Sequence, residues 1–302
     1  MSMNTGSISR ALLPGVNFWV GLAYNEVAAQ YSQVFKTMSS DLNFEELVSA
    51  YGLGLAVVKP EGESVSYDTM AQGFSKYVAH TTYGIGYVIS EEAVDDNKYQ
   101  QLAEMRSRQI GLSLRQTKEN VAMAVLNRAF NNSYVGADGL ELCSTAHLLA
   151  KGGTFRNELA TAADLSEASL EQAIIDIMDF KNDAGLKIEV MPRKLLIPKE
   201  LQFEAERILH SSMQVNSAEH NVNALKSMGS LPEGFAVNRY LSDTDAWFVL
   251  TNAENGFMHF QRKALEVKNE SDFDNGNLKF KGQERYSFSY GDPRCVFGSP
   301  GA

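Results

Sequence analysis

The sequence predicts a mixed α+β fold with one unusually long helix and a series of antiparallel strands at the end of the chain. Three observations support this prediction. Residues 96–131 form a helical pattern without proline, residues 55–90 are rich in Val, Tyr, Thr and Ile, and from residue 234 short apolar runs alternate with turn signals. The order along the chain is arm, hairpin, long helix, α/β segment and terminal strands.

The N-terminal segment divides into an arm and a helix. Small and polar residues dominate residues 1–16, and Pro14-Gly15 indicates a turn, so we expect no regular structure there. Residues 17–38 carry apolar side chains at helical spacing, which predicts a helix. A connector begins at Asp41 and Asn43.

Residues 55–90 predict a β-hairpin followed by one more strand. The turn signal is Pro60-Glu61-Gly62-Glu63, which separates two strand-like runs. An isolated two-stranded ribbon is marginally stable in water. If this hairpin projects from its domain, it needs a neighbour to lie on.

The clearest element is the helix over residues 96–131. Asp95, Asp96 or Asn97 can cap its start, Gly111 is its one glycine, and Asn131-Asn132-Ser133 ends it. About 34 residues at 1.5 Å each give roughly 50 Å, so this helix is expected to run the length of a domain. Its apolar stripe comprises Leu102, Met105, Ile110, Leu114, Val121, Val125, Leu126 and Ala129.

The rest of the chain alternates between short helices and strands. Residues 134–163 are loop-rich, and a helix over 164–185 is predicted to be capped near Ser166 and Ser169 and ended by Gly185. One or two buried strands interrupted by Pro192, a helix over 199–212, and a surface loop or mobile segment over 213–230 follow. In the terminal strands, Asn255-Gly256 and Asn275-Gly276 predict hairpins, Tyr286, Phe288 and Tyr290 share one face, and residues 291–302 end the sheet.

Composition excludes several classes of function. The 302 residues carry a net charge of −10 without a dense Lys/Arg cluster, which argues against sequence-specific nucleic-acid binding. No stretch approaches the ~18–20 apolar residues of a membrane span, and no signal peptide is visible. Cys143 and Cys295 lie far apart in unlike contexts, so we interpret both as buried thiols.

Motifs of catalysis and of cofactor or metal binding are missing from the sequence. Gly52-x-Gly54 and Gly84-x-Gly86 lack the third glycine and the helix of a phosphate loop, and no GxSxG motif occurs. The histidines are not at metal-ligand spacing, and we interpret them as structural or surface residues. They are His80, His147, His210, His220 and His259. We therefore expect no catalytic, cofactor-binding or metal site, although a triad assembled in space stays open.

Segments across nearly the whole chain carry a family resemblance. These segments are LLPGVNFWVGLAYNE (12–26), SYDTMAQGF (66–74), QTKENVAMAVLNRAFNNSYVGADGLELCSTAH (116–147), GGTFRNELATAADLSEASLEQAIIDIM (152–178), LKIEVMPRKLLIPKEL (186–201), NALKSMG (223–229), DAWFVLTN (245–252) and ERYSFSYGDPR (284–294). Through them the sequence resembles the Mu-like major head subunit family of tailed phages and prophages. One departure is Leu148, which stands where the family's STAHP motif has proline, and it affects a single loop.

The resemblance implies the Hong Kong ninety-seven capsid fold, with an N-arm, an extended loop, a peripheral domain with a long spine helix, and an axial domain. By position, the N-arm is residues 1–50 and the extended loop with its flanking strands is 51–96. The peripheral domain is 97–185, the axial domain is 186–255, and the terminal strands 256–302 return to the peripheral domain.

The implied function is that of a major capsid protein that self-assembles into the icosahedral shell enclosing phage DNA. The implied partners are further copies of the chain in pentamers and hexamers, a portal, an optional decoration protein and packaged DNA bound non-specifically, with no membrane. Virions would assemble in the host cytoplasm. No long charged helical extension precedes the arm, so we expect a separate scaffolding protein. Some relatives crosslink through Lys and Asn, but nothing in the sequence around Lys59 or Lys76 predicts such a bond.

Two other classes of protein stay open as alternatives. One is an enzyme with an unrecognised site, such as a prohead protease, which a nucleophile with a shifted pKa in a pocket would favour. The other is a tail tube or decoration protein. The long helix argues against both, because tail tube and decoration proteins are mostly β.

Overall fold

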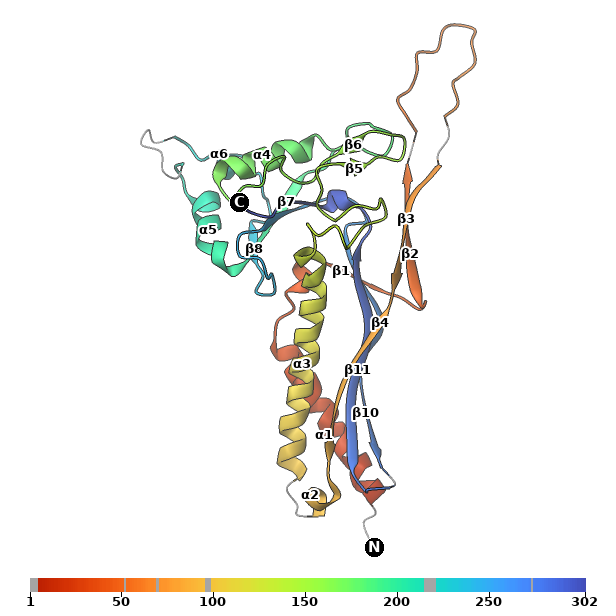
Figure 1. The fold of residues 1–302 in the computed structure, drawn as a ribbon, viewed down its shortest axis with the longest axis vertical. Helices are drawn as coiled ribbons and strands as arrows, with labels where there is room; N and C mark the ends of the chain where they lie inside the picture. The colour runs from red at the N-terminus through yellow and green to blue at the C-terminus, as the bar shows by residue number, and fades with distance from the viewer. Residues whose placement is uncertain (1–4, 52, 69–70, 96–98, 215–220, 273) are drawn as a thin grey trace.

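The computed structural model describes residues 5–51, 53–68, 71–95, 99–214, 221–272 and 274–302. The molecule is elongated, with a long narrow body, a wider head at one end, and a loop that projects beyond the head (Figure 1). Helices and mixed sheets alternate along the chain, which confirms the predicted α+β class.

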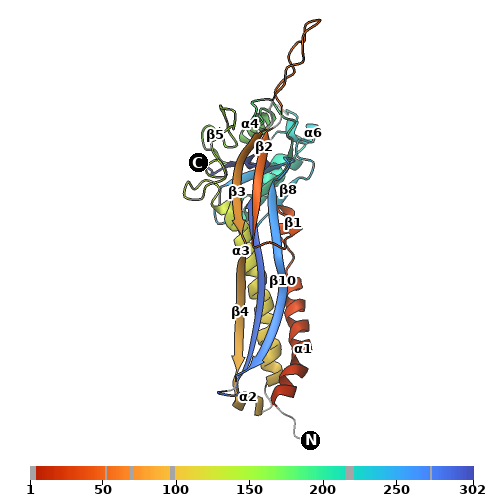
Figure 2. The ribbon, with the colours of Figure 1, turned by 90° about the vertical axis from the view of Figure 1, so that its right-hand side faces the viewer.

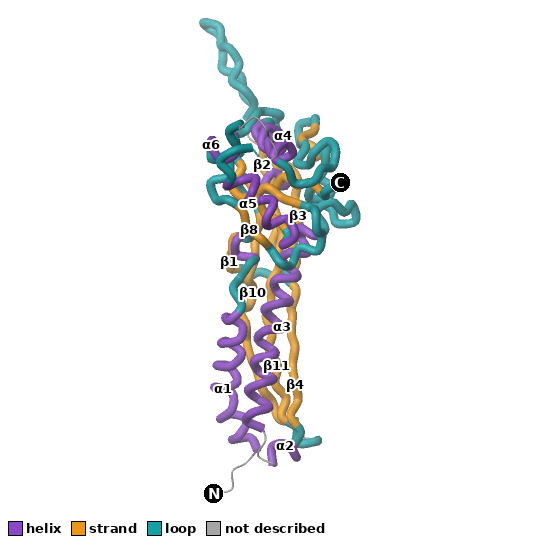
Figure 3. The backbone as a smooth tube through the Cα atoms, turned by 90° about the vertical axis from the view of Figure 1, so that its left-hand side faces the viewer, coloured by secondary structure: helices purple, strands orange, loops and turns teal. Residues whose placement is uncertain are grey.

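The body is a four-stranded sheet with two long helices on one face (Figures 2 and 3). Its strand order is β1 (Lys36–Ser39), β10 (Phe257–Ser271), β11 (Leu278–Tyr290) and β4 (Thr81–Ile89). The β1–β10 pair is parallel and the other two pairs are antiparallel. The covering helices are α1 (Thr5–Glu26) and α3 (Tyr99–Asn127), with the short α2 (Glu91–Asp95) at the far end.

The N-terminal expectation was wrong from Thr5 onward, because residues expected to form an irregular arm belong to helix α1. Val16, Val20 and Ala23 are buried against α3 and β11, and this packing outweighs the turn signal of Pro14-Gly15. The helix predicted over 17–38 stops at Glu26. The helix is followed by one turn of 3₁₀ helix, η1 (Tyr31–Gln33), and then by strand β1. Residues 1–4 lie outside the described residues.

The long helix is confirmed, with 29 residues in α3. Its buried stripe includes Ile110, Leu114 and Leu126, whereas Met105 is exposed, contrary to the prediction. Two glycines allow the close packing. A Cβ on Gly111 would lie 2.5 Å from the Val20 carbonyl oxygen of α1, and one on Gly282 of β11 would lie 2.9 Å from a methyl of Ile110.

The hairpin and the strand after it are confirmed, but the two hairpin strands lie further along the chain from the turn at residues 60–63 than predicted. They are β2 (Phe44–Tyr51) and β3 (Ala71–Ala79), which together form a two-stranded ribbon. The residues 53–68, expected to be strands, form the irregular loop that projects beyond the head. A turn brings the Glu63 amide 3.3 Å from the Pro60 oxygen. The rest of the loop has no neighbouring strand with which to pair.

The head is built on a second sheet, in the order β12 (Val296–Ser299), β9 (Trp247–Thr251), β7 (Pro192–Ile197) and β8 (Phe235–Val237). Helices α4 (Glu167–Met178) and α5 (Gln202–His210) pack on it through one hydrophobic core, which contains Trp247 and Ile177. Smaller elements complete the head: β5 (His147–Leu148), β6 (Thr154–Phe155), η2 (Lys199–Leu201), α6 (Ala224–Met228) and η3 (Pro293–Cys295).

Several boundaries in the head differ from the prediction. Helix α4 has the expected Ser166/Ser169 capping box, but it ends at Met178, well before Gly185. Of the one or two strands expected around Pro192, the structure has one, β7, which begins at Pro192 and is not interrupted by it. The segment 213–230 contains helix α6, and the chain end forms strand β12, because both bury apolar side chains in the head.

The two Asn-Gly pairs behave differently. Asn275-Gly276 joins β10 to β11 as a hairpin, which confirms that prediction. Asn255-Gly256 instead connects β9 of the head to β10 of the body, so the predicted hairpin there was wrong. Asn255 has a φ of 54°, as a tight turn requires, but the two flanking strands enter different sheets.

Candidate assembly surfaces

The projecting loop, residues 53–68, exposes a concentration of apolar side chains. Val58 is 89% exposed and Tyr67 is 92% exposed. Local contacts at its base are the Gly54 amide to Asp68 Oδ2, at 2.7 Å, and Lys151 Nζ to the same oxygen, at 3.4 Å. Contiguous apolar surface of this kind is typical of an interaction site. Its exposed large apolar residues are Leu53, Leu55, Val57, Val58, Val65 and Tyr67.

The apolar character continues down the outer face of the ribbon. Phe44 and Tyr77 are exposed, and their ring centroids are 5.7 Å apart across the β2–β3 pair. Val48, further along β2, is also exposed. The loop and the ribbon therefore both expose apolar side chains that this subunit does not cover itself.

Two further apolar groups lie elsewhere on the molecule. Phe203, Val222 and Met228 are exposed on the head, at or beside α5 and α6. Phe18 and Leu22 are exposed on α1 in the body. Apolar surface is thus distributed over both ends of the subunit, as a protein with several neighbours requires.

A buried polar network joins α1, α3 and β11 inside the body. Lys118 Nζ of α3 lies 3.2 Å from Glu284 Oε2 of β11, and the Tyr24 hydroxyl of α1 donates to the same oxygen at 3.2 Å. Glu119 accepts the backbone amides of Gln30 and Tyr31 at 2.9 Å each. Burial raises the pKa of Glu284 and lowers that of Lys118, while their mutual attraction opposes both shifts.

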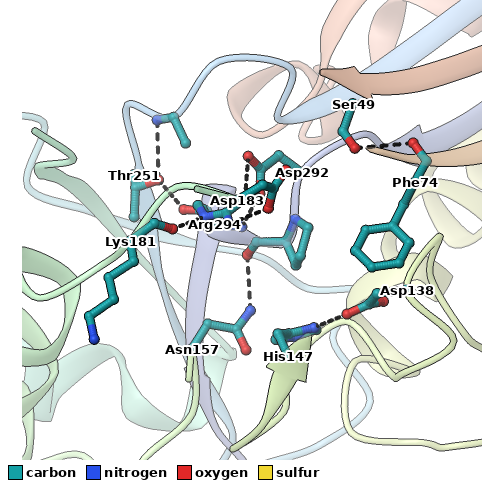
Figure 4. A network of polar contacts seen from close by, with 12 residues as sticks. Ser49, Phe74, Asp138, His147, Asn157, Lys181, Asp183, Thr251, Asp292 and Arg294 are labelled. Carbon is teal, nitrogen blue, oxygen red and sulfur yellow. Dashed lines mark hydrogen bonds and ion pairs between the residues drawn. The ribbon is translucent and has the colours of Figure 1, made fainter. Parts of the chain in front are cut away.

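A second network joins the chain end to the head (Figure 4). The Arg294 guanidinium donates to Asp183 at 2.8 Å, to Asp292 at 3.1 Å and to the Lys181 carbonyl at 2.7 Å. The Thr251 hydroxyl of β9 donates to the Arg294 carbonyl at 2.6 Å. These contacts join η3, which directly precedes β12, to β9 and to the segment after α4.

Neither network was foreseen from the sequence. A signal was available in α3, because Arg115, Lys118 and Glu119 share helical spacing with the buried Leu114 and Ala122. Charged side chains on the buried face of a helix require partners, and this rule points to an internal ion network. The strand partner Glu284 could not be identified by spacing.

His147, His259 and both cysteines lie in the protein interior. His147 Nδ1 lies 2.5 Å from Asp138, and His259 Nδ1 lies 3.2 Å from the Thr37 hydroxyl. Cys143 and Cys295 are buried free thiols, as predicted, and burial raises the pKa of each well above its usual value. His210 is exposed beside Glu206, and His220 lies outside the described residues.

The described ranges contain neither a cluster of metal-ligating side chains nor a membrane-spanning helix. No group of three His, Cys, Asp or Glu side chains there could hold a metal ion. No helix in the same ranges is long and apolar enough to cross a membrane. Lys59 is exposed in the projecting loop, whereas the Lys76 ammonium lies 3.7 Å above the Tyr290 ring, and burial lowers the pKa of Lys76 to about 8.

The fold and its exposed apolar surfaces define an elongated structural subunit of a protein assembly. Residues 73–298 match the family described as "Phage capsid protein", and the chain belongs to that family. It is a major capsid protein, a structural component of the virion and not an enzyme. Among curated proteins, none matches the sequence.

Solved capsid structures share the fold at low sequence identity. The mature capsid of bacteriophage PhiM1 has a TM-score of 0.58 and 11% identity, over 90% of this chain and 87% of that one. The capsid of cyanophage P-SCSP1u has a TM-score of 0.54 and 13% identity, over 89% and 86%. A virus-like particle from Pyrococcus furiosus has a TM-score of 0.52 and 8% identity, over 94% and 97%. The chain therefore has the fold of these capsid subunits.

Proposed function

We propose that this chain is a Mu-like major head subunit whose copies form pentamers and hexamers in an icosahedral shell around phage DNA. The observation that carries the proposal is the projecting loop 53–68, which extends beyond the head and exposes Val58 and Tyr67 almost completely. Such a loop gains stability only when its apolar side chains are buried on another molecule. In a closed shell of identical subunits, the adjacent copy supplies that surface.

The division into an N-arm, an extended loop, a peripheral domain and an axial domain is part of this proposal. The ribbon and loop correspond to the extended loop, α3 to the spine helix of the peripheral domain, and the head to the axial domain. The shared core of α4 and β7 favours assigning α4 to the axial domain, although the sequence placed its residues in the peripheral segment 97–185.

Partners other than copies of the chain complete the proposal. They are a scaffolding protein and a portal during assembly in the host cytoplasm, and packaged DNA held without sequence specificity. A decoration protein is a further candidate, since the capsid of bacteriophage JBD30, which shares this fold at a TM-score of 0.55, is described as decorated with minor capsid protein trimers.

Electron microscopy and light scattering of the purified chain test the proposal. We expect closed shells, tubes or isolated pentamers and hexamers for the natural sequence. Replacing Val58 and Tyr67 by serine should abolish these assemblies while leaving the circular dichroism spectrum unchanged, because both side chains lie outside the core.

The matched control is Ser64→Ala, an exposed change in the same loop that removes no apolar surface. It should assemble as the natural chain does. Full assembly of the Val58/Tyr67 variant would refute the role given to the loop. A strictly monomeric natural chain, even with a candidate scaffolding protein present, would refute the assembly proposal as a whole.

A further inference from the structure

His80 occupies the point where the ribbon leaves the sheet of the body. It is the single residue between β3 and β4, and β3 continues the line of β4 past it (Figure 1). The ribbon covers the sheet face opposite the helices. The apolar part of this contact is small, because it consists of Val78, Met258 and Phe260 with Leu47 packed against them.

The His80 side chain is completely buried between four segments. Its Nδ1 lies 2.9 Å from the Ser287 hydroxyl of β11, and its Nε2 lies 3.1 Å from the Ser40 hydroxyl, just after β1. The His80 amide donates to the Asn43 carbonyl before β2 at 3.3 Å, and the His80 carbonyl accepts from Arg285 Nε at 3.2 Å. Because a hydroxyl can donate or accept, the neutral ring has both nitrogens satisfied.

Burial disfavours the protonated form of this ring, and the charges around it act in both directions. Glu45 of β2 is the nearest anion, with Oε1 3.9 Å from Nε2. Arg285 of β11 and Arg262 of β10 oppose it, and Arg262 is itself 3.7 Å from Asp41. Burial lowers the pKa of His80 most, Glu45 raises it, and Arg285 and Arg262 lower it further, so the net shift is downward.

We propose that His80 makes the docking of the ribbon pH-dependent, with the ribbon docked when the imidazole is neutral and released when it is protonated. A docked ribbon buries the added charge, at a cost that Glu45 offsets only in part, whereas a released ribbon exposes the ring to water. Protonation therefore favours the released state. This mechanism acts within one subunit, so its test is independent of shell assembly.

The sign and size of the effect follow from proton linkage. In the released ribbon the ring titrates near its ordinary value of 6.5, and in the docked ribbon it titrates lower. As the pH falls below that value, the ratio of docked to released ribbon decreases by up to about tenfold per pH unit, until the docked form is also protonated. The Lys76 contact with Tyr290 does not contribute, because Lys76 stays charged throughout this range.

Distance measurement between two spin labels tests the proposal in the full chain. Labels on Ser75→Cys of the ribbon and Lys281→Cys of β11 occupy exposed positions, while the native cysteines are buried. Labelled chain is diluted with unlabelled chain so that only distances within one subunit are detected. We expect one narrow distribution at about pH 7.5 and a second, longer population at about pH 5.

Three variants discriminate the role of His80 from general acid effects. His80→Gln, which keeps hydrogen bonding without titrating, should show the narrow distribution at both pH values. Glu45→Gln should increase the released population in acid, because it removes the compensating anion. His210→Gln, an exposed histidine on α5, is the matched control and should respond as the natural chain does.

Circular dichroism at both pH values verifies that the subunit stays folded. An unchanged distance distribution of the natural chain in acid would overturn the proposal. Equal release in His80→Gln and the natural chain would overturn it as well. If His80→Gln does not fold, the Glu45→Gln variant decides, and a smaller released population in that variant would contradict the mechanism.

Discussion

Lys118 of the spine helix and Glu284 of β11 form an ion pair at 3.2 Å, with exposures of only 2% and 1%. The pair lies where α1, α3 and the body sheet meet, and Tyr24 of α1 donates to the same carboxylate. A charged pair at this depth is costly to desolvate, and removing one partner leaves the other buried without compensation. The pair therefore makes the contact between helices and sheet specific for one arrangement.

Replacing Lys118 by methionine should destabilise the subunit by about 3–5 kcal/mol, because Glu284 stays buried without its cation. The double variant Lys118→Met/Glu284→Gln should lose less, since no lone charge remains. Urea denaturation followed by circular dichroism measures both. Lys187→Met, which breaks an exposed pair with Asp179, is the control and should leave the stability almost unchanged, because solvent screens that pair. A double variant that loses as much stability as Lys118→Met, or more, would contradict this coupling between Lys118 and Glu284.

Gly111→Ala should destabilise the protein, although the same change inside an unpacked helix usually stabilises it by about 0.5–1 kcal/mol. The added Cβ would lie 2.5 Å from the Val20 oxygen and 3.0 Å from the Tyr24 nitrogen, so α1 has to move. We expect a loss of about 1–3 kcal/mol. Thermal unfolding provides the measurement, with Gln109→Ala on the exposed side of α3 as control. A more stable Gly111→Ala variant would show that the helices can separate freely.

Cys143 and Cys295 should resist a thiol-specific reagent such as Ellman's reagent in the folded subunit. Both thiols are buried, and burial raises the pKa of each, which suppresses the reactive thiolate. Both should react in denaturant. Rapid reaction of either thiol without denaturant, at neutral pH, would mean that the core around it opens readily.

His259 should make the subunit less stable in acid. Burial lowers its pKa to about 3, far below the ordinary 6.5. Between these two pH values the ring is protonated in the unfolded chain and neutral in the folded chain. The stability present above about pH 6.5 should therefore decrease as the pH falls toward 3.

His259→Phe removes this titration and keeps the aromatic stack with Phe288, whose ring centroid is 4.4 Å away. The urea midpoint of this variant should depend less steeply on pH than that of the natural chain. Identical pH dependence would assign the acid effect to other groups.

Sequence patterns identified the elements whose signals are local. The stripe of Ile110, Leu114 and Leu126 predicted the spine helix, the Asn275-Gly276 pair predicted a hairpin, and Ser166 with Ser169 predicted a helix cap. Each of these features depends on residues close together in the chain. The order of hairpin, long helix and terminal strands was accessible for the same reason, whereas the capsid fold was implied by the family resemblance.

The features that failed depend on contacts between distant segments. Residues from Thr5 form a helix because α3 buries Val16 and Val20, and β12 exists because β9 is available for pairing. Asn255-Gly256 has the local conformation of a turn, yet the flanking strands belong to two sheets.

The α+β class, the long helix and the presence of a hairpin were predictable from the sequence alone, because periodicity and turn chemistry are local properties. Only the tertiary structure decided where buried charges find their partners, as Lys118 does with Glu284 across 166 positions. It also decided that His80 lies enclosed where the ribbon meets the sheet. The physical reason is that burial and Coulomb interaction depend on distances in space, which spacing along a chain does not specify.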